Sequence, residues 1–140
     1  MESLEMAQAA GAPIETLESW FSAHNWLHER IGDDEIVASA KGAWSTYELR
    51  GLWRDDDCVL QFLAFPDIKV TENQAASVYE AIGLINEQLW LGHFEYWPST
   101  GIIVYRHAAL LDSGSGEAVF SFEQAEVMVE AAIDELDRFY

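Results

Sequence analysis

The amino-acid sequence predicts an α+β domain in which three helices pack against a five-stranded antiparallel sheet. Three segments carry apolar residues at the three- and four-residue spacing of a helix surface. Five other segments show the two-residue period or the continuous apolar character of strands. Short turns join neighbouring strand segments, and strands joined in this way pair antiparallel. The resulting order, α-β-β-β-α-β-β-α, is typical of an α+β fold.

The first helix is expected to start at Pro13, because proline is favoured in the first turn of a helix. Ile14, Leu17, Trp20 and Phe21 form its apolar stripe, and the helix is expected to end within residues 26–29. Residues 1–12 are small and polar, so they are interpreted as a flexible lead-in. The remaining residues, 13–140, are expected to form a single domain.

Three strands are expected next, over residues 36–41, 43–54 and 58–65. In the second of these, alternation places Tyr47, Leu49 and Trp53 on one face. The other face carries Trp44, Thr46, Glu48, Arg50 and Arg54. This pattern predicts a sheet with one face covered by helices and one face partly in water. The third strand is apolar on both faces, which indicates a central position in the sheet.

The second helix is expected to begin after a capping box at Thr71 and Gln74 and to run to about Trp90. Ile85 and Leu89 lie four residues apart and therefore share one face of this helix. Gly92 is expected to end the helix, because glycine readily takes the left-handed backbone found at helix ends.

The last two strands are expected over residues 93–97 and 102–111, followed by a loop over residues 112–117. A second capping box, formed by Ser121 and Gln124, predicts the start of the third helix. Its apolar face comprises Ala125, Met128, Val129, Ala132, Ile133, Leu136 and Phe139.

The composition excludes some kinds of partner. A net charge of −18 in 140 residues repels phosphate backbones and anionic membrane surfaces, so neither nucleic acid nor membrane is expected as a partner. Cys58 is the only cysteine, which rules out an intramolecular disulfide and favours a reducing compartment. The first residues carry glutamates where a signal peptide carries lysine or arginine, so a cytoplasmic location is expected.

Candidate catalytic and metal-binding residues are incomplete as sets. His24 and His28 have the spacing of two metal ligands on a helix, but Glu29 is the only further ligand nearby. The acidic runs at residues 33–35 and 55–57 lack the ligand alternation of a calcium loop. His93 and Glu95 share a strand face, yet no complete set of nucleophile, base and orienting group is evident. We therefore expect no metal, no cofactor and no enzymatic activity.

The polar face of the predicted sheet is a candidate recognition surface. Arginine and tryptophan are enriched where interfaces bind tightly. The predicted partner-binding residues are Trp44, Glu48, Arg50, Arg54, Trp97 and Arg106. The alternative is that Arg50 and Arg54 only pair with Glu48 and other neighbouring carboxylates. A second functional hypothesis is a small-molecule pocket between helices and sheet, lined by Tyr47, Trp53 and Phe94.

Several of these residues give the chain a resemblance to the YbjN family of bacterial proteins. The residues concerned are Trp44, Tyr47, Leu49, Arg50, Trp53, Ile85, Asn86, Leu89, Gly92, His93, Phe94, Trp97, Tyr105, Arg106 and His107. The resemblance implies a sensory transduction regulator with a fold similar to that of type III secretion chaperones, which are small acidic homodimers that bind partner polypeptides. It thus favours a chaperone-like protein-binding module that is a homodimer, with a small-molecule-sensing regulator as the alternative.

Overall fold

A computed structural model of the protein describes residues 12–111 and 120–140. These residues form the helices α2 (Ala12–Ala23), α3 (Ala75–Asn86) and α4 (Phe122–Phe139), and the short 3-10 helix η1 (Glu72–Gln74). The strands are β1 (His28–Arg30), β2 (Glu35–Lys41), β3 (Thr46–Arg54), β4 (Val59–Phe65), β5 (His93–Trp97) and β6 (Ile102–Leu110). Residues 1–11 of the expected lead-in, and the expected loop over residues 112–117, lie outside the described residues.

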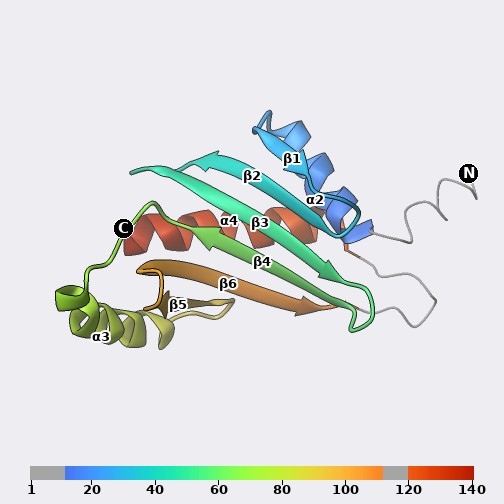
Figure 1. Cartoon of the computed structure of the whole chain (residues 1–140). Coiled ribbons are helices and arrows are strands. Elements are labelled where there is room, and N and C mark those ends of the chain that lie inside the picture. The colour runs from blue at the N-terminus through green and yellow to red at the C-terminus, as the bar shows by residue number, and fades with distance from the viewer. Residues whose placement is uncertain (1–11, 112–119) are drawn as a thin grey trace, which may run out of the picture.

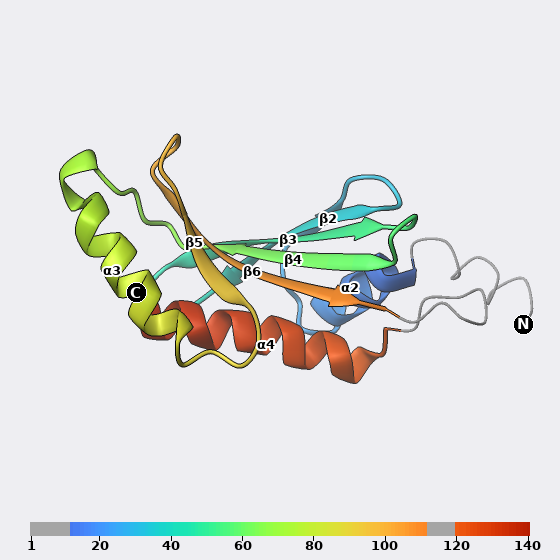
Figure 2. The ribbon, with the colours of Figure 1, turned by 90° about the horizontal axis from the view of Figure 1, so that it is seen from below.

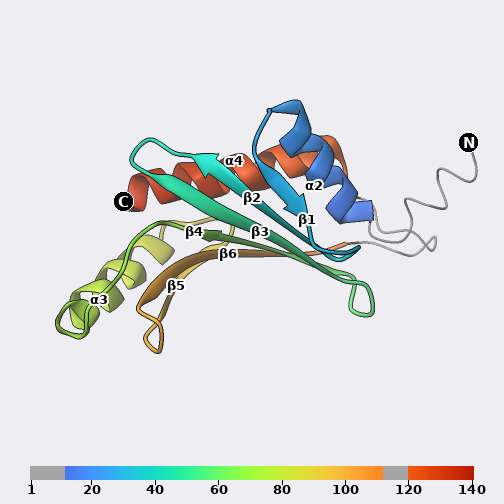
Figure 3. The same ribbon diagram turned by 45° about the horizontal axis from the view of Figure 1, so that its top comes forward.

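The strands form one antiparallel sheet in the order β1-β2-β3-β4-β6-β5 (Figure 1). The predicted α+β class with an antiparallel sheet is confirmed. The prediction of five strands is wrong, because β1 adds a sixth strand at the edge beside β2 (Figure 3). Three polar residues with no apolar alternation, His28 to Arg30, gave no strand signal in the sequence.

The sixth strand exists because α2 ends at Ala23, several residues before the predicted end. Asn25 has a left-handed φ of 58°. The N–H of Trp26 donates to the carbonyl of Phe21 at 3.0 Å, and the N–H of Asn25 donates to that of Ser22 at 3.1 Å. This pair of bonds is a Schellman ending, in which asparagine replaces the more usual glycine. The chain then turns back and residues 28–30 pair with β2.

The second helix also ends early. α3 stops at Asn86, whereas the sequence predicts a helix to about Trp90. Gly92 does adopt the expected left-handed backbone, with φ of 71°, but it directs the chain into β5 and does not end the helix. Residues 87–92 therefore form a connection between α3 and β5.

The helices are distributed unequally around the sheet. α2 and α4 contact each other and cover one face, whereas α3 lies at one end against β5 (Figure 2). The core between them is formed by side chains such as Ile14, Leu17, Trp20, Leu49, Phe62, Tyr105, Val129 and Leu136. No helix among the described residues covers the opposite face of the sheet, which we call the open face (Figure 2).

The predicted capping box at the start of α4 is confirmed. The hydroxyl of Ser121 accepts a hydrogen bond from the N–H of Gln124 at 3.0 Å, and the N–H of Ser121 donates to the side-chain oxygen of Gln124 at 2.7 Å. These two bonds satisfy backbone groups that have no partner inside the helix. Of the predicted apolar face, Ala125, Met128, Val129, Ala132 and Leu136 are buried.

Candidate protein-binding face

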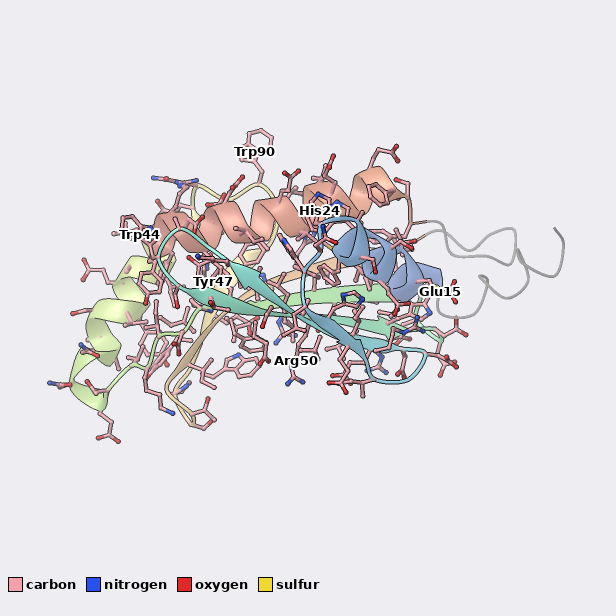
Figure 4. The ribbon with its side chains drawn as sticks, turned by 90° about the horizontal axis from the view of Figure 1, so that it is seen from above. Glu15, His24, Trp44, Tyr47, Arg50 and Trp90 are labelled. Carbon is pink, nitrogen blue, oxygen red and sulfur yellow. The ribbon has the colours of Figure 1, made fainter. Side chains whose placement is uncertain are left out.

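The open face is built from alternate residues of β2 to β6. Arg50 lies opposite Val37 on β2 and opposite Leu63 on β4, so these three side chains share a face. Arg106 lies opposite Leu63 and His93, which extends the same face to β5. In Figure 4 the side chain of Arg50 points away from α2 and α4. The structure thus places Glu48, Arg50, Arg54, Trp97 and Arg106, five of the six predicted partner-binding residues, on one surface.

A groove of about 640 Å³ crosses this surface. Its apolar lining consists of Leu52, Leu63, Phe65, Pro66, Ile68, Trp97 and Ile102. Its polar lining consists of Glu35, Thr46, Glu48, Arg50, Asp67 and Lys69. Phe65 and Trp97 contact each other edge to face, with their ring centroids 6.1 Å apart. An apolar centre with a charged rim is the usual composition of a protein interface.

The positive charge of the chain is concentrated around this face. The protein has seven lysine and arginine residues. Lys41, Arg50, Arg54 and Arg106 lie on the open face, and Lys69 lines the groove. In a chain of net charge −18, this distribution gives the open face an electrostatic character different from that of the helices.

The arginines of the open face are paired with carboxylates. Arg50 Nε lies 2.8 Å from Glu48 Oε2, and its Nη1 lies 3.3 Å from Glu35 Oε2. Arg54 Nε lies 3.1 Å from Asp57 Oδ2. These contacts agree with the alternative interpretation of local charge pairing. Because the pairs are partly accessible to water, each contributes little to stability and is available to a partner.

A second polar cluster centres on Glu95. Arg106 donates from Nη2 to Glu95 Oε1 at 3.1 Å, Trp97 donates from Nε1 to the same oxygen at 2.9 Å, and His93 Nε2 lies 2.6 Å from Oε2. Burial alone raises the pKa of Glu95, but the hydrogen bonds from Trp97, His93 and Arg106 outweigh this effect and lower the pKa to about 2. A carboxylate of such low basicity is poorly suited to general base catalysis near neutral pH.

Trp44 is the one predicted partner-binding residue that lies elsewhere. β3 begins at Thr46, and Trp44 belongs to the turn closed by a bond from the N–H of Gly42 to the carbonyl of Ser45. Its indole N–H donates to the carbonyl of Asp137 at 3.1 Å. Figure 4 shows Trp44 beside the end of α4. The alternation that predicted its direction applies only within a strand, so extending it into the turn placed Trp44 on the wrong side.

The three residues predicted to line a small-molecule pocket are buried in the core. Tyr47 donates from its hydroxyl to Asp137, Trp53 donates from its indole to Asp55 at 3.3 Å, and the Phe94 ring stacks on Phe139. Tyr47 and Trp53 lie six residues apart on β3, which corresponds to about 20 Å. A ligand would reach this set only if the packing changed, so its binding role stays a prediction.

The histidine pair proposed from spacing does not lie on one helix. His24 follows the end of α2, and His28 begins β1. The Nδ1–H groups of both donate to backbone carbonyls, those of Trp20 at 2.9 Å and Trp26 at 2.8 Å. Within residues 12–111 and 120–140, no three histidine, cysteine or acidic side chains gather closely enough to hold a metal ion.

Sequence reasoning missed several residues of the groove. Leu52 and Phe65 follow from strand alternation once β3 and β4 are paired in register. Ile68 and Lys69 follow Pro66 outside any strand, and contacts between distant residues, such as the isolated bridge between Lys69 and Ile102, bring that segment to the sheet. No local sequence pattern predicts such a contact.

This arrangement defines a class: an α+β protein whose antiparallel sheet has helices on one face and a grooved, mixed-charge surface on the other. A family model matches residues 13–140, and the chain belongs to the YbjN family, whose description is "Putative bacterial sensory transduction regulator". No curated protein matches the chain.

The fold is also similar to a solved structure, the crystal structure of YbjN, "a putative transcription regulator from E. coli". The TM-score is 0.60 and the sequence identity 12%, and the match covers 90% of this chain and 87% of that one. At this identity the likeness concerns the fold alone. No helix in the described part of the chain is long and apolar enough to cross a membrane.

Proposed function

We propose that this protein is a non-enzymatic, chaperone-like binding module that takes part in regulation by holding a segment of a partner protein on its open face. The observation that carries this proposal is the groove itself, which has an apolar floor and a rim of ion pairs. It lies on a sheet face that no helix of residues 12–111 and 120–140 covers. Extended and amphipathic segments bind to surfaces of this kind through apolar anchors.

The chemistry of the face favours protein over nucleic acid as the partner. Glu35, Glu48 and Glu95 alternate with the arginines, so the face is not a continuous basic patch. A phosphate backbone would meet these carboxylates as well as the overall charge of −18. The family description as a sensory transduction regulator agrees with control exerted through protein contacts.

The test is affinity capture from the native host with the wild type and two groups of variants. Arg50→Ala and Trp97→Ala change the groove, whereas Trp44→Ala removes an exposed aromatic ring from the other side of the molecule. We expect a partner captured by the wild type and by Trp44→Ala, with affinity for the groove variants at least about tenfold lower.

Circular dichroism should show all variants to be folded, and the captured partner should then be titrated in purified form. If the partner binds Trp97→Ala, Arg50→Ala and the wild type with equal affinity, the open face is not its binding site. A saturable thermal shift with a metabolite, in the absence of any protein partner, would favour the small-molecule alternative.

We also propose that the protein is a homodimer, in which the two copies meet through the open face when no partner segment occupies it. The mixture of arginines and carboxylates on this face allows each copy to present both signs of charge to the other. Light scattering of the wild type and of Trp97→Ala tests this: the wild type should have the mass of a dimer and the variant that of a monomer.

A further inference from the structure

β1 is an outer strand of the sheet, and no strand in the described part of the chain pairs with its outer side (Figure 3). Its hydrogen bonds with β2 extend one residue beyond each end of the strand. The N–H of Ser39 donates to the carbonyl of Leu27 at 2.9 Å. The N–H of Ile31 donates to the carbonyl of Glu35, also at 2.9 Å. Residues 27–31 therefore form one extended edge.

The outer side of this edge carries backbone groups that can bind another chain. In an antiparallel pair, residues whose N–H and C=O groups bond to the neighbouring strand alternate with residues whose groups point away from it. Leu27 and Ile31 bond to β2, and Glu29 lies midway between them. The N–H and C=O groups of His28 and Arg30 therefore point outward, where a further extended segment can pair with them.

On the open face, the edge presents two apolar side chains with one carboxylate between them. Glu29 lies opposite Val37 of the open face, so its side chain points to that face. Leu27 and Ile31, two residues away on either side, point the same way and are 80% and 46% exposed. Glu29 is exposed too, and it forms no ion pair with any residue in the described ranges. A hollow of about 400 Å³ lies beside Leu27 and Glu29, with Val37 and Ser39 in its lining.

On the other face of the edge, the side chains already have partners within the protein. Arg30 points to the face that α2 covers, and its Nη1 lies 3.1 Å from Glu18 Oε1. The Nδ1–H of His28 donates to the carbonyl of Trp26 at 2.8 Å. Recognition by side chains therefore depends on the open-face side of the edge.

The charge and the spacing of Leu27, Glu29 and Ile31 specify the partner. In an antiparallel segment paired with the edge, lysine or arginine fits opposite Glu29, because opposite charges attract across strands. The residues two positions before and after it lie on the same face and meet Ile31 and Leu27, so apolar residues fit there. A second copy paired over the whole edge would place Glu29 opposite Glu29, where like charges repel. Charged edge strands usually resist pairing, and here the charge restricts it to a basic segment.

We propose that the edge formed by residues 27–31 binds an extended segment of a partner protein with the pattern apolar–x–basic–x–apolar, where x is any residue except proline. The segment pairs antiparallel with β1 and adds a strand to the sheet. Its basic side chain meets Glu29, and its two apolar side chains cover Leu27 and Ile31. The site is additional to the proposed function, because none of residues 27–31 lines the groove of the open face.

The experiment titrates the isotope-labelled full chain with the peptide valine–threonine–lysine–threonine–valine, blocked at both ends, and follows the backbone amide resonances by NMR. One control peptide exchanges the lysine with the threonine before it. Composition and charge stay the same, but the lysine then lies opposite Arg30 on the other face. A second control peptide has proline in place of the second threonine, which removes a backbone hydrogen-bond donor and keeps the charge.

Three protein variants complete the design. Glu29→Lys reverses the charge of the edge, whereas Glu130→Lys makes the same change at an exposed position of α4. Trp97→Ala changes the groove of the open face and leaves the edge intact. A peptide with glutamate in place of lysine is the partner that matches Glu29→Lys.

We expect the lysine peptide to bind the wild type saturably, with a Kd below about 1 mM and with resonance shifts centred on residues 27–31. Binding should be at least about fivefold weaker for Glu29→Lys and for both control peptides. Glu130→Lys and Trp97→Ala should change the affinity less than about twofold. Glu29→Lys should bind the glutamate peptide more tightly than the wild type does.

Several results would each overturn the proposal. Equal binding of the exchanged peptide would show attraction by charge alone, and equal binding of the proline peptide would exclude pairing with β1. An unchanged affinity of Glu29→Lys, the absence of saturable binding, or shifts centred away from residues 27–31 would exclude the edge. Capture of a partner through the groove is measured separately, so this proposal and the proposed function can fail independently.

Discussion

Asn86, the last residue of α3, pairs with the backbone of Phe94 in β5 as a neighbouring strand would. The N–H of Phe94 donates to the side-chain oxygen of Asn86 at 2.8 Å, and the side-chain nitrogen of Asn86 donates to the carbonyl of Phe94 at 3.1 Å. β5 is an edge strand, and its outer backbone groups have no partner strand among the described residues. One amide side chain therefore satisfies both backbone groups of Phe94 and attaches α3 to the sheet.

Replacing Asn86 by alanine is expected to lower the free energy of unfolding by about 1–3 kcal/mol, because it removes both partners from the backbone of a buried residue. Urea denaturation measures the change. Gln88→Ala is the matched control: Gln88 is exposed and its side chain makes only a long, 3.5 Å contact with Arg138. An effect of equal size in both variants would mean that the loss does not come from the two hydrogen bonds of the Asn86 amide.

Asp137 joins the end of α4 to the turn between β2 and β3. Its carboxylate accepts hydrogen bonds from the Tyr47 hydroxyl at 2.5 Å and from the N–H of Ala43 at 2.9 Å. Asp137→Ala leaves the hydroxyl of a fully buried tyrosine without this partner, so we expect a loss of about 1–3 kcal/mol. Asp134→Ala, at an exposed position of the same helix, should change the free energy of unfolding by less than about 0.5 kcal/mol.

Glu95 is expected to make stability depend on acid pH. Its pKa in the folded protein is about 2, below the value of about 4.3 for an unperturbed glutamate. Its contribution is therefore fully present above about pH 5 and is lost as the pH falls towards 2. Because solvent partly reaches the carboxylate and screens it, the contribution is about 1–2 kcal/mol.

The measurement is urea denaturation of the wild type and Glu95→Gln at several pH values between 5 and 2. The wild type should be the more stable protein at pH 5, and the difference should shrink on acidification. Glu130→Gln, at an exposed position of α4, should track the wild type. A gap between wild type and Glu95→Gln that is constant with pH would contradict the lowered pKa of Glu95.

Two tyrosines are expected to destabilise the protein in alkali. Burial and the nearby Asp137 raise the pKa of Tyr47, and burial, with a smaller effect from Glu135, raises that of Tyr105 to about 12. Unfolded tyrosines ionise near pH 10. The unfolded state therefore gains stability as the pH rises above 10, while the folded state keeps both protons.

Guanidinium denaturation between pH 9 and pH 11 tests the predicted direction of the change in stability. The free energy of unfolding should fall with rising pH, and Tyr105→Phe should reduce the slope, because one group that ionises differently in the two states is gone. Tyr79→Phe, at an exposed position of α3, should leave the slope unchanged. Identical slopes in Tyr105→Phe and the wild type would contradict the raised pKa of Tyr105.

Much of the open face could be predicted from the sequence, because alternation within a strand is a local property. Glu48, Arg50 and Arg54 share the solvent side of β3 as the two-residue period requires. The predicted direction of the Trp44 side chain was wrong because β3 begins two residues after Trp44. The groove also needs the segment after Pro66, and the contact of Lys69 with Ile102 joins residues far apart in the chain.

The helix ends show the same difference between features set by neighbouring residues and features set by distant ones. The capping box of Ser121 and Gln124 involves two residues only three positions apart, so the start of α4 was predictable from the sequence. Asn25 is also a local signal for the end of α2, since asparagine tolerates the left-handed backbone. The end of α3 has no such local signal, because the Asn86 amide forms its hydrogen bonds with the backbone of Phe94 in β5.

The sequence by itself determined the α+β class, the antiparallel pairing of strands joined by short turns, and the faces of the long strands and helices. These properties depend on spacing and turn residues, which act over a few positions. The tertiary structure decided the sixth strand, the early end of α3, the groove around Lys69 and the direction of Trp44. Each of these depends on which distant backbone or side-chain groups satisfy one another's hydrogen bonds and cover one another's apolar surface, and local spacing does not encode that choice.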